Sequence, residues 1–278
     1  MQVFEKPEDV RQWSREQHSS GKSVGLVPTM GYLHQGHLSL VAEARKRSDA
    51  VAVSIFVNPT QFGPNEDFDK YPRDPERDIE LCRNAGVAAA FMPLPATMYV
   101  PDASTSVVEE CLSAGLCGAR RPGHFRGVCT VVAKLFNIAL PDVAVFGQKD
   151  FQQAAVIRQM ACDLNFPVEI VTAPTVREPD GLAMSSRNAY LTPAERLRAL
   201  GVSRALHSAA AALADGVSDA DTLRRIMADE LDRHDLRTDY AEIVNPHNLK
   251  PVSQASPGDV ALVAAYCGKT RLIDNLIL

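Results

Sequence analysis

Two histidines three residues apart, His34 and His37, flank Gly36 in the sequence His-Gln-Gly-His. An apolar run at residues 23–29 precedes them, and an amphipathic helical pattern follows. A strand, a glycine-bearing turn and a helix start place both imidazoles where helix N-terminal N–H groups favour an anion, and Gly36 lets a bulky ligand approach the backbone. The arrangement predicts phosphate binding and therefore nucleotide chemistry. The alternative is a polar turn with two solvated histidines, because short motifs often occur by chance.

Further polar segments follow other predicted strands. They are Asn58–Phe62 after a strand at 50–57, Gly147–Gln153 after a strand at 142–147, and Met184–Arg187 at a predicted domain junction. Sites in parallel α/β folds lie at the carboxyl ends of strands. We therefore expect these segments and the histidine pair to meet at one edge of a sheet.

Each segment also has a purely structural interpretation. Asn58 with the proline after it is a common turn element, Asp150 could cap the next helix, and Ser185–Arg187 could form a plain loop. Lys149 could be a solvated charge, yet a lysine between a strand and a helix is a common point charge for a phosphate. The convergence of the segments on one sheet edge favours a functional site.

Two charged stretches could add to such a site. The segment Gly118–Gly127 carries three arginines and a histidine between glycines, which suits a mobile loop that brings positive charge toward an acidic substrate. A solvated basic loop is the alternative. Acidic residues at 65–69 and 74–78 could supply a magnesium carboxylate, because Mg²⁺ in nucleotide sites uses one or two carboxylates plus phosphate oxygens. Most of these acids fit helix starts and surface positions.

Composition restricts the class of protein. The chain has 278 residues, of which 46% are hydrophobic and 23% charged, and its net charge is -5. It is ordinary for a soluble globular protein, and it lacks the basic field that a nucleic-acid partner would need. The six cysteines form no CxxC pair, so buried thiols are expected. No signal-peptide core and no run of roughly 18 apolar residues is present, so we expect a cytoplasmic protein with no membrane partner.

Strand-like runs alternate with helical patterns in the first two thirds of the chain. The predicted strands are 23–29, 50–57, 87–92, 142–147 and 167–172, and the predicted helices are 37–47, 75–85, 127–140 and 150–164. Because each parallel connection needs a crossover, this alternation predicts an α/β fold whose parallel sheet is covered on both faces.

The pattern changes after Asn188 to alanine-rich helices and short strands. The helices are expected at 193–214 and 218–234, and the strands near 238–244, 258–266 and 271–277. The segment 174–187, which contains prolines and a glycine, is the expected hinge. We therefore predict a larger domain at 1–176 and a smaller α+β domain at 177–278.

Five blocks of the sequence resemble, in the same order, those of the pantothenate synthetases, or pantoate–β-alanine ligases. The blocks are residues 28–37, 56–62, 121–127, 146–153 and 180–188, and the stretches 262–266 and 271–275 match as well. The resemblance covers essentially the whole chain. One departure is Gln148, where glutamate is the commoner residue in the family, and this puts in doubt only a charge at that position.

The resemblance implies a HIGH-motif nucleotidyltransferase with a Rossmann-like N-terminal domain, a C-terminal lid domain and a homodimeric state. Such an enzyme condenses pantoate with β-alanine using ATP and Mg²⁺. The reaction passes through a pantoyl-adenylate and releases pyrophosphate and then AMP.

The resemblance also implies roles for individual residues. The catalytic residues would be His34, His37, Lys149, Ser185, Ser186 and Arg187. ATP would be bound by these six together with Met30, Gly147, Asp150 and Met184. Pantoate would be bound by Met30, Gln61, Phe62, Gln153, Arg121 and His124. Asp78 would be a magnesium ligand.

Two other functions remain open at this point. One is an HxGH nucleotidyltransferase that transfers AMP or CMP to a phosphate-bearing acceptor, which would need a basic acceptor pocket in place of Gln61 and Gln153. The other is a non-catalytic nucleotide-binding regulator, which would leave the two histidines, Lys149 and the Ser-Ser-Arg run unexplained.

Overall fold

The computed structural model describes all 278 residues, and the chain forms two compact units. The first unit contains residues 1–110, 121–147 and 153–174. The second unit contains residues 111–120, 148–152 and 175–278. Two short excursions, 111–120 and 148–152, therefore group with the C-terminal part of the chain, and nothing in the sequence pattern indicates this exchange.

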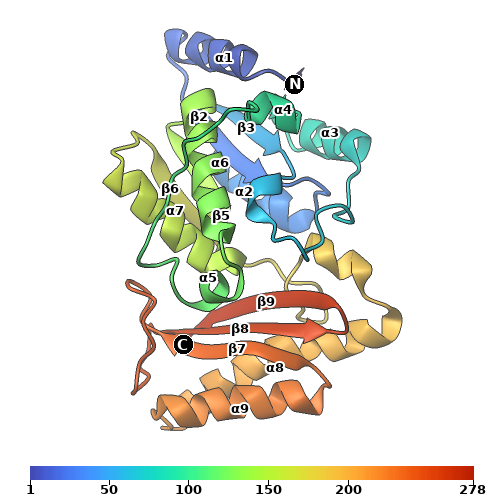
Figure 1. Cartoon of the computed structure of the whole chain (residues 1–278), viewed down its shortest axis with the longest axis vertical. Helices are drawn as coiled ribbons and strands as arrows, with labels where there is room; N and C mark the ends of the chain where they lie inside the picture. Colours follow the sequence, from blue (N-terminus) through green and yellow to red (C-terminus); the bar gives the residue numbers. More distant parts are fainter. The chain divides into compact units, whose positions relative to one another are not determined.

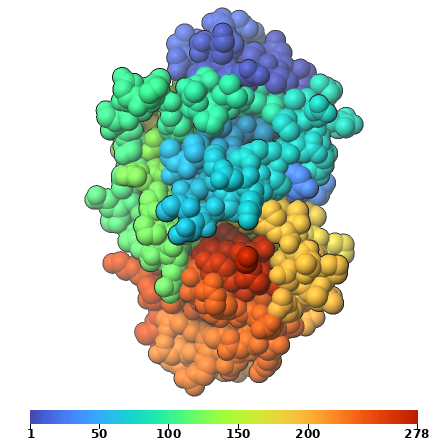
Figure 2. Space-filling model, turned by 45° about the vertical axis from the view of Figure 1, so that its right-hand side comes forward, coloured from blue at the N-terminus to red at the C-terminus, as the bar shows by residue number.

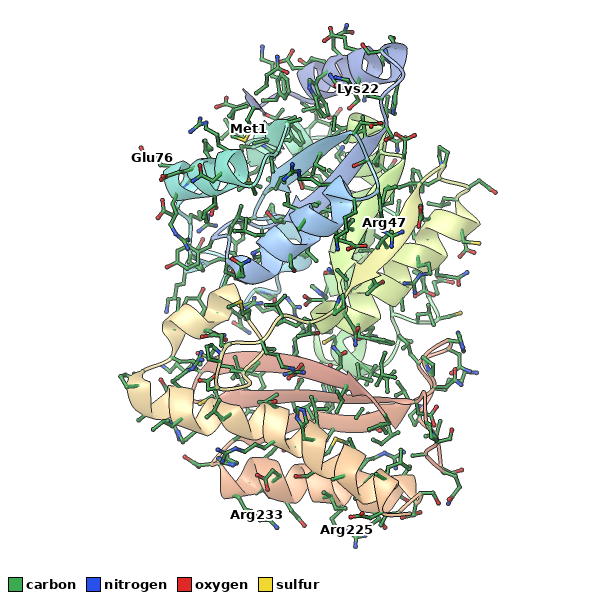
Figure 3. The ribbon with its side chains drawn as sticks, turned by 180° about the vertical axis from the view of Figure 1, so that it is seen from behind. Met1, Lys22, Arg47, Glu76, Arg225 and Arg233 are labelled. Atoms are coloured by element: carbon green, nitrogen blue, oxygen red, sulfur yellow. The ribbon has the colours of Figure 1, made fainter.

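The first unit is built on a six-stranded parallel sheet, as the alternation of strands and helices predicts. Its strands are β1 (Gln2–Phe4), β2 (Val24–Thr29), β3 (Ala50–Ile55), β4 (Ala89–Phe91), β5 (Val143–Gly147) and β6 (Glu169–Ala173), and their order is β1-β4-β3-β2-β5-β6. The central strands β2 and β3 are almost wholly buried, as expected where helices cover both faces of a parallel sheet. Figure 1 shows helix α6 in front of this sheet, and Figure 3, seen from behind, shows α2 in front of it.

Helices connect the parallel strands. They are α1 (Pro7–Ser19), α2 (Gln35–Arg45), α3 (Pro75–Asn84), the one-turn α4 (Pro95–Met98), α6 (His124–Ala139) and α7 (Phe151–Asp163). Helices α2 and α6 begin two and three residues earlier than the sequence pattern predicts. The difference makes His34 the N-cap of α2 and places His124 in the first turn of α6. The strand β1 and the helices α1 and α4 were not expected.

The second unit has a three-stranded antiparallel sheet and two long helices. The strands β7 (Arg237–Val244), β8 (Val260–Cys267) and β9 (Thr270–Ile277) lie in the order β7-β8-β9. Helices α8 (Pro193–Ala214) and α9 (Ala220–Arg233) pack together and on this sheet around an apolar core. The short helix α5 (Leu116–Arg120) also belongs to this unit. The α+β architecture expected for the C-terminal part is thus present.

No helix of the chain has both the length and the apolar character needed to span a membrane.

Candidate active site

The two histidines of the His-Gln-Gly-His segment cap the start of α2. His34 has an extended backbone, and its Nδ1 accepts the N–H of Gly36 at 3.1 Å. His37 reciprocates, because its Nδ1 accepts the N–H of His34 at 3.2 Å. The ring centroids are 4.0 Å apart. In a neutral imidazole whose Nδ1 accepts a hydrogen bond the proton is on Nε2, so this network assigns two Nε2–H donors to a helix N-terminus that already favours anions.

Asp78 shapes the loop that leads into this helix. Its carboxylate lies on α3, is only 1% exposed, and accepts the N–H groups of Tyr32 and Leu33, each at 2.7 Å. Burial raises the pKa of Asp78, and the two backbone N–H groups oppose that shift. Gly31 has φ +82°, and a Cβ there would lie 3.0 Å from the Asp78 carboxylate, so the turn requires glycine.

These contacts do not fit the expected role of Asp78 as a magnesium ligand. Both of its oxygens are buried and hydrogen-bonded to the backbone. No group of three His, Cys, Asp or Glu side chains in the chain could hold a metal ion. The two backbone hydrogen bonds assign Asp78 to positioning of the loop before α2.

Gln61 lies in a short turn after β3, the 3₁₀ helix Pro59–Gln61. Asn58, 1% exposed, donates its Nδ2 to Gln61 Oε1 at 3.2 Å and to the carbonyl of Gly127 at 3.1 Å. Tyr99 in turn donates its hydroxyl to Asn58 Oδ1 at 2.8 Å. These bonds fix which end of the Gln61 amide is oxygen, and they leave its Nε2 beside Met30 Sδ at 3.0 Å. The structure thus brings together Met30 and Gln61, both of which the family resemblance assigns to pantoate.

Helix α6 supports this turn from the other side. A Cβ at Gly127 would lie 2.4 Å from the carbonyl oxygen of Thr60 and 2.6 Å from the backbone nitrogen of Gln61. Only glycine allows this close approach of helix and turn. His124, one turn earlier on α6, has its Nδ1 2.9 Å from the carbonyl oxygen of Gln61.

Arg121 and His124, expected to bind pantoate, also contact this turn. Arg121 donates from Nε and Nη2 to the Glu66 carboxylate at 2.7 and 2.6 Å, and its Nη1 lies 3.0 Å from His124 Nε2. Burial alone would raise the pKa of Glu66, but the hydrogen bonds and charge of Arg121 outweigh it and hold that pKa below its ordinary value. Arg121 is therefore neutralised within the protein. Figure 2 shows the loop that carries Glu66, in cyan, at the surface of the first unit.

Phe62 and Gln153 are the other two residues expected to bind pantoate. Phe62 packs edge-on against the rings of Phe68 and Tyr71, with centroids 5.4 and 6.0 Å away. Gln153 is half-buried on α7. Its neighbour Gln152, to which the sequence gave no role, is buried and accepts the N–H of Cys117 at 2.9 Å.

In the second unit, Lys149 and Asp150 lie in the 3₁₀ turn Gln148–Asp150, directly after Gly147 at the end of β5. Lys149 Nζ is 3.8 Å from Asp150 Oδ2, and the lysine side chain is 20% exposed. The predicted position between a strand and a helix is thus confirmed for this lysine.

The segment Met184–Arg187 follows a small hairpin in the same unit. Ser185 caps the 3₁₀ helix Ser186–Tyr190, and its Oγ accepts the N–H of Arg187 at 3.3 Å. Asn188 donates its side-chain amide to the carbonyl of Ala183 at 3.1 Å and to Glu178 Oε1 at 2.8 Å. The Ser-Ser-Arg run therefore sits on an ordered turn.

Arg196 holds the Glu178 carboxylate that accepts the hydrogen bond from Asn188. It donates to both oxygens of Glu178 at 2.8 Å and also to Asp180 at 2.7 Å. The hydrogen bond from Arg196 is the main reason that the pKa of Glu178 is lowered.

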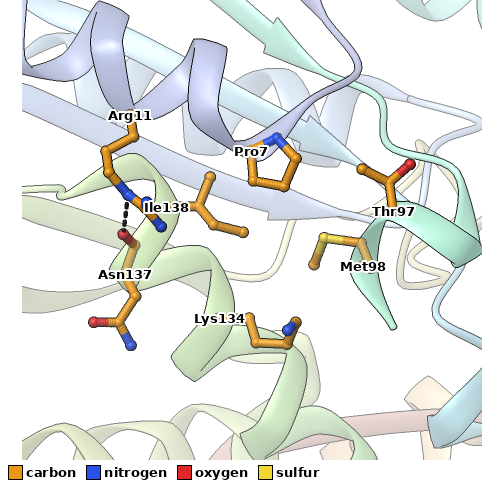
Figure 4. A pocket seen from close by; sticks show the side chains of 7 residues that line it. All are labelled: Pro7, Arg11, Thr97, Met98, Lys134, Asn137 and Ile138. Atoms are coloured by element: carbon orange, nitrogen blue, oxygen red, sulfur yellow. Dashed lines mark hydrogen bonds between the residues drawn. The ribbon is translucent and has the colours of Figure 1, made fainter. Parts of the chain in front are cut away.

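A pocket in the first unit is separate from all of these residues. It has a volume of about 300 Å³ and is lined by residues of α1, α4 and α6: Pro7, Arg11, Thr97, Met98, Lys134, Asn137 and Ile138 (Figure 4). None of the expected site residues lines it, so it is not the candidate site.

The comparison with known proteins decides the family. A model of the pantoate–β-alanine ligase family matches residues 2–277. The chain belongs to this family. A pantothenate synthetase of Thermotoga neapolitana is 53% identical over the full length of both chains, and one of Myxococcus xanthus is 54% identical over 97% of this chain and 94% of its own.

Solved ligases of the family share the fold. A pantothenate synthetase of Thermus thermophilus superposes with a TM-score of 0.94 at 46% identity, over 100% of this chain and 99% of its own. A pantoate–β-alanine ligase of Francisella tularensis, solved with β,γ-ATP and β-alanine, gives a TM-score of 0.82 at 32% identity, over 100% and 97%. The chain is therefore a ligase of pantothenate biosynthesis, and the family decides against both a different nucleotidyltransferase and a non-catalytic regulator.

Proposed function

We propose that the chain joins pantoate to β-alanine in two steps through a pantoyl-adenylate. The observation that carries this proposal is the reciprocal capping of His34 and His37, which assigns an Nε2–H donor to each ring at the N-terminus of α2. Two such donors suit the phosphates of ATP, the nucleotide that accompanies β-alanine in the Francisella ligase.

The first step brings two anions together. A carboxylate is a poor acylating agent, so a pantoate carboxylate oxygen attacks the α-phosphorus of ATP, a new P–O bond forms, and the bond to the β-phosphate breaks to release pyrophosphate. The protein must neutralise and align the groups. His34 and His37 would donate to phosphate oxygens, while Lys149, Ser185, Ser186 and Arg187 would stabilise the charge that develops on the transferred and leaving groups.

The remaining nucleotide contacts would come from residues beside these groups. We propose that Asp150 and the Gly147 region hold the ribose, and that Met30 and Met184 line the nucleotide site. Mg²⁺ would enter with the ATP phosphates, whose charge it would offset.

The pantoate side would be held by neutral amides. Gln61 has its Oε1 occupied by Asn58 and its Nε2 directed to Met30, so it offers a donor and no positive charge. Such a donor fixes a carboxylate or hydroxyl without forming an ion pair that would weaken the nucleophile. Gln153 would add a second amide, and Met30 and Phe62 an apolar wall. Arg121 and His124 would act on pantoate through the Gln61 turn that they contact.

In the second step the amine of β-alanine attacks the acyl carbon of the adenylate. A C–N bond forms, the C–O bond to AMP breaks, and the amine gives up a proton to solvent.

We propose further that residues 1–176 bind nucleotide and pantoate, that residues 177–278 act as a lid, and that the enzyme is a cytoplasmic homodimer.

The proposal is tested by incubating the protein with ATP, Mg²⁺, pantoate and labelled β-alanine. Labelled pantothenate and AMP should appear in equal amounts, and neither should appear when pantoate is omitted. ADP in place of AMP would contradict the adenylate, and absence of any labelled product would contradict the ligase function itself.

A further inference from the structure

Asn275 on β9 holds the peptide groups on both sides of Lys149. Its side chain is 2% exposed, and its Nδ2 donates to the carbonyl of Gln148 at 2.8 Å and to the carbonyl of Lys149 at 3.0 Å. These two carbonyls belong to the peptide bonds before and after Lys149. One side-chain amide therefore fixes the orientation of the backbone from which the lysine extends.

The preceding residue of β9 holds the other charged segment of the second unit. Asp274, 3% exposed, accepts from Arg177 Nη1 at 2.6 Å and from Nη2 at 3.1 Å. Arg177 lies in the hairpin that leads to Ser185, pairs across it with Ala183, and donates to the carbonyl of Gly181 at 3.1 Å. The bidentate pair thus ties this hairpin to the strand.

The strand that carries both residues, β9, is hydrogen-bonded to β8 along its whole length. Every residue of β9 from Thr270 to Ile277 is paired with β8. Successive side chains of a strand point to opposite faces, so Asp274 and Asn275 hold the hairpin and the Lys149 turn from the two faces of one strand.

Burying the side-chain amide of Asn275 costs free energy that its hydrogen bonds must offset. Its Oδ1 is buried and has no hydrogen-bond partner. Rotating the amide would place that oxygen against two carbonyl oxygens and would leave the NH₂ group unpaired instead, so the orientation is fixed. An apolar side chain would avoid the unpaired Oδ1 but would take the donor away from the carbonyls of Gln148 and Lys149, which indicates that the position requires the donor.

We infer that Asn275 is a positioning residue for Lys149, and that the Arg177–Asp274 pair does the same for Ser185–Arg187. Asp274 and Asn275 together keep the two sets of phosphate ligands at a fixed distance from each other. The inference rests on the proposed function, in which those groups bind the phosphates of ATP.

The test is a double-mutant cycle on ATP affinity, measured by calorimetric titration of ATP without pantoate. The variant Asn275→Asp keeps the shape of the side chain and replaces the donor by an acceptor, and Asn275→Ala removes the donor without adding a charge if the first variant does not fold. Each should weaken ATP binding by about tenfold, a factor that corresponds to one hydrogen bond to a charged group. Added to Lys149→Ala, either change should weaken binding little further, because residues that act through one another are not additive.

A matched control is Asn137→Asp, which removes a side-chain amide that donates to the carbonyl of Ala133 at 3.0 Å on α6. This variant should bind ATP as the wild type does. Fully additive losses for position 275 and Lys149, or unchanged affinity in Asn275→Ala, would overturn the inference. If the wild-type protein itself bound ATP but made no pantothenate, the proposed function would fail and the positioning role would still be decided by the cycle.

Discussion

His34 and His37 hold each other in place: each ring accepts a backbone N–H on Nδ1, at 3.1 and 3.2 Å, and the ring centroids lie 4.0 Å apart. A capping box is normally built from a hydroxyl and a carboxamide or carboxylate. Here each imidazole accepts a backbone N–H on Nδ1, and in the neutral ring this leaves the proton on Nε2. The motif is therefore both a helix cap and a pair of donors, and these two functions can be separated by mutation.

We predict that His34→Asn keeps the cap and loses the chemistry. Asparagine is among the best N-cap residues, so the free energy of unfolding should stay near that of the wild type, while adenylation should slow at least about tenfold through loss of a hydrogen bond worth roughly 1.5 to 3 kcal/mol. His34→Ala should slow adenylation similarly and also lose about 1 kcal/mol of stability. Denaturant unfolding and rate measurements on both variants check this. Normal activity in His34→Asn would show that the histidine is only a cap. Equal stability losses in the two variants would contradict the claim that asparagine preserves the cap.

A negative charge at Gln61 should expel pantoate selectively. In Gln61→Glu the new carboxylate would lie where the amide faces Met30, beside the expected position of the pantoate carboxylate, and like charges about 4 Å apart at an effective dielectric near 20 repel by about 4 kcal/mol. Calorimetric titration should show much weaker pantoate binding and nearly unchanged ATP binding. Equal weakening of both ligands, or unchanged pantoate binding, would place Gln61 outside the acid pocket.

Gly127→Ala should disturb the turn that carries Gln61 from the side of α6. The added Cβ would meet the Thr60 carbonyl and the Gln61 backbone nitrogen at 2.4 and 2.6 Å, and both are backbone atoms that cannot rotate away. We expect a loss of about 1 to 3 kcal/mol in the free energy of unfolding together with weaker pantoate binding. Gly115→Ala is the control, because a Cβ there meets nothing within 4 Å. A fully stable Gly127→Ala variant with normal pantoate affinity would show that helix and turn separate without consequence.

The sequence predicted the elements that come from local periodicity. The strands β2, β3 and β5 and helix α8 lie within two residues of their predicted bounds, because buried apolar runs and helical spacing are visible along the chain. The strand β1 is only three residues long and pairs with β4 about 87 residues later. Such pairing depends on tertiary contacts that no local pattern contains.

The site shows the same limit. The histidine pair and Lys149 could be proposed as site residues because each follows a predicted strand and has a side chain that suits a phosphate. The loop-shaping role of Asp78, by contrast, depends on N–H groups 45 and 46 residues earlier in the chain. Asn275 could not be assigned to the Lys149 turn either, because its partners are more than 120 residues away.

The pH dependence of stability should include a contribution from Glu178. The pKa of Glu178 is lowered from its ordinary value of 4.5, chiefly by the hydrogen bond from Arg196. A carboxyl group with a lowered pKa in the folded state stabilises that state above its ordinary pKa, and this stability is lost as the pH falls below 4.5 because the unfolded chain binds the proton more readily. Melting temperatures of the wild type and Glu178→Gln should differ most near pH 7 and converge toward pH 3. A constant difference across this range would contradict the assigned ion pair.

The central claim, that this ligase activates pantoate as an adenylate, is tested most directly by exchange of labelled pyrophosphate into ATP. With pantoate present and β-alanine absent, label should enter ATP, because formation of the adenylate is reversible and needs only the first two substrates. Exchange should stop when pantoate is withdrawn. Exchange that required β-alanine, or no exchange from a preparation that makes pantothenate, would contradict the account.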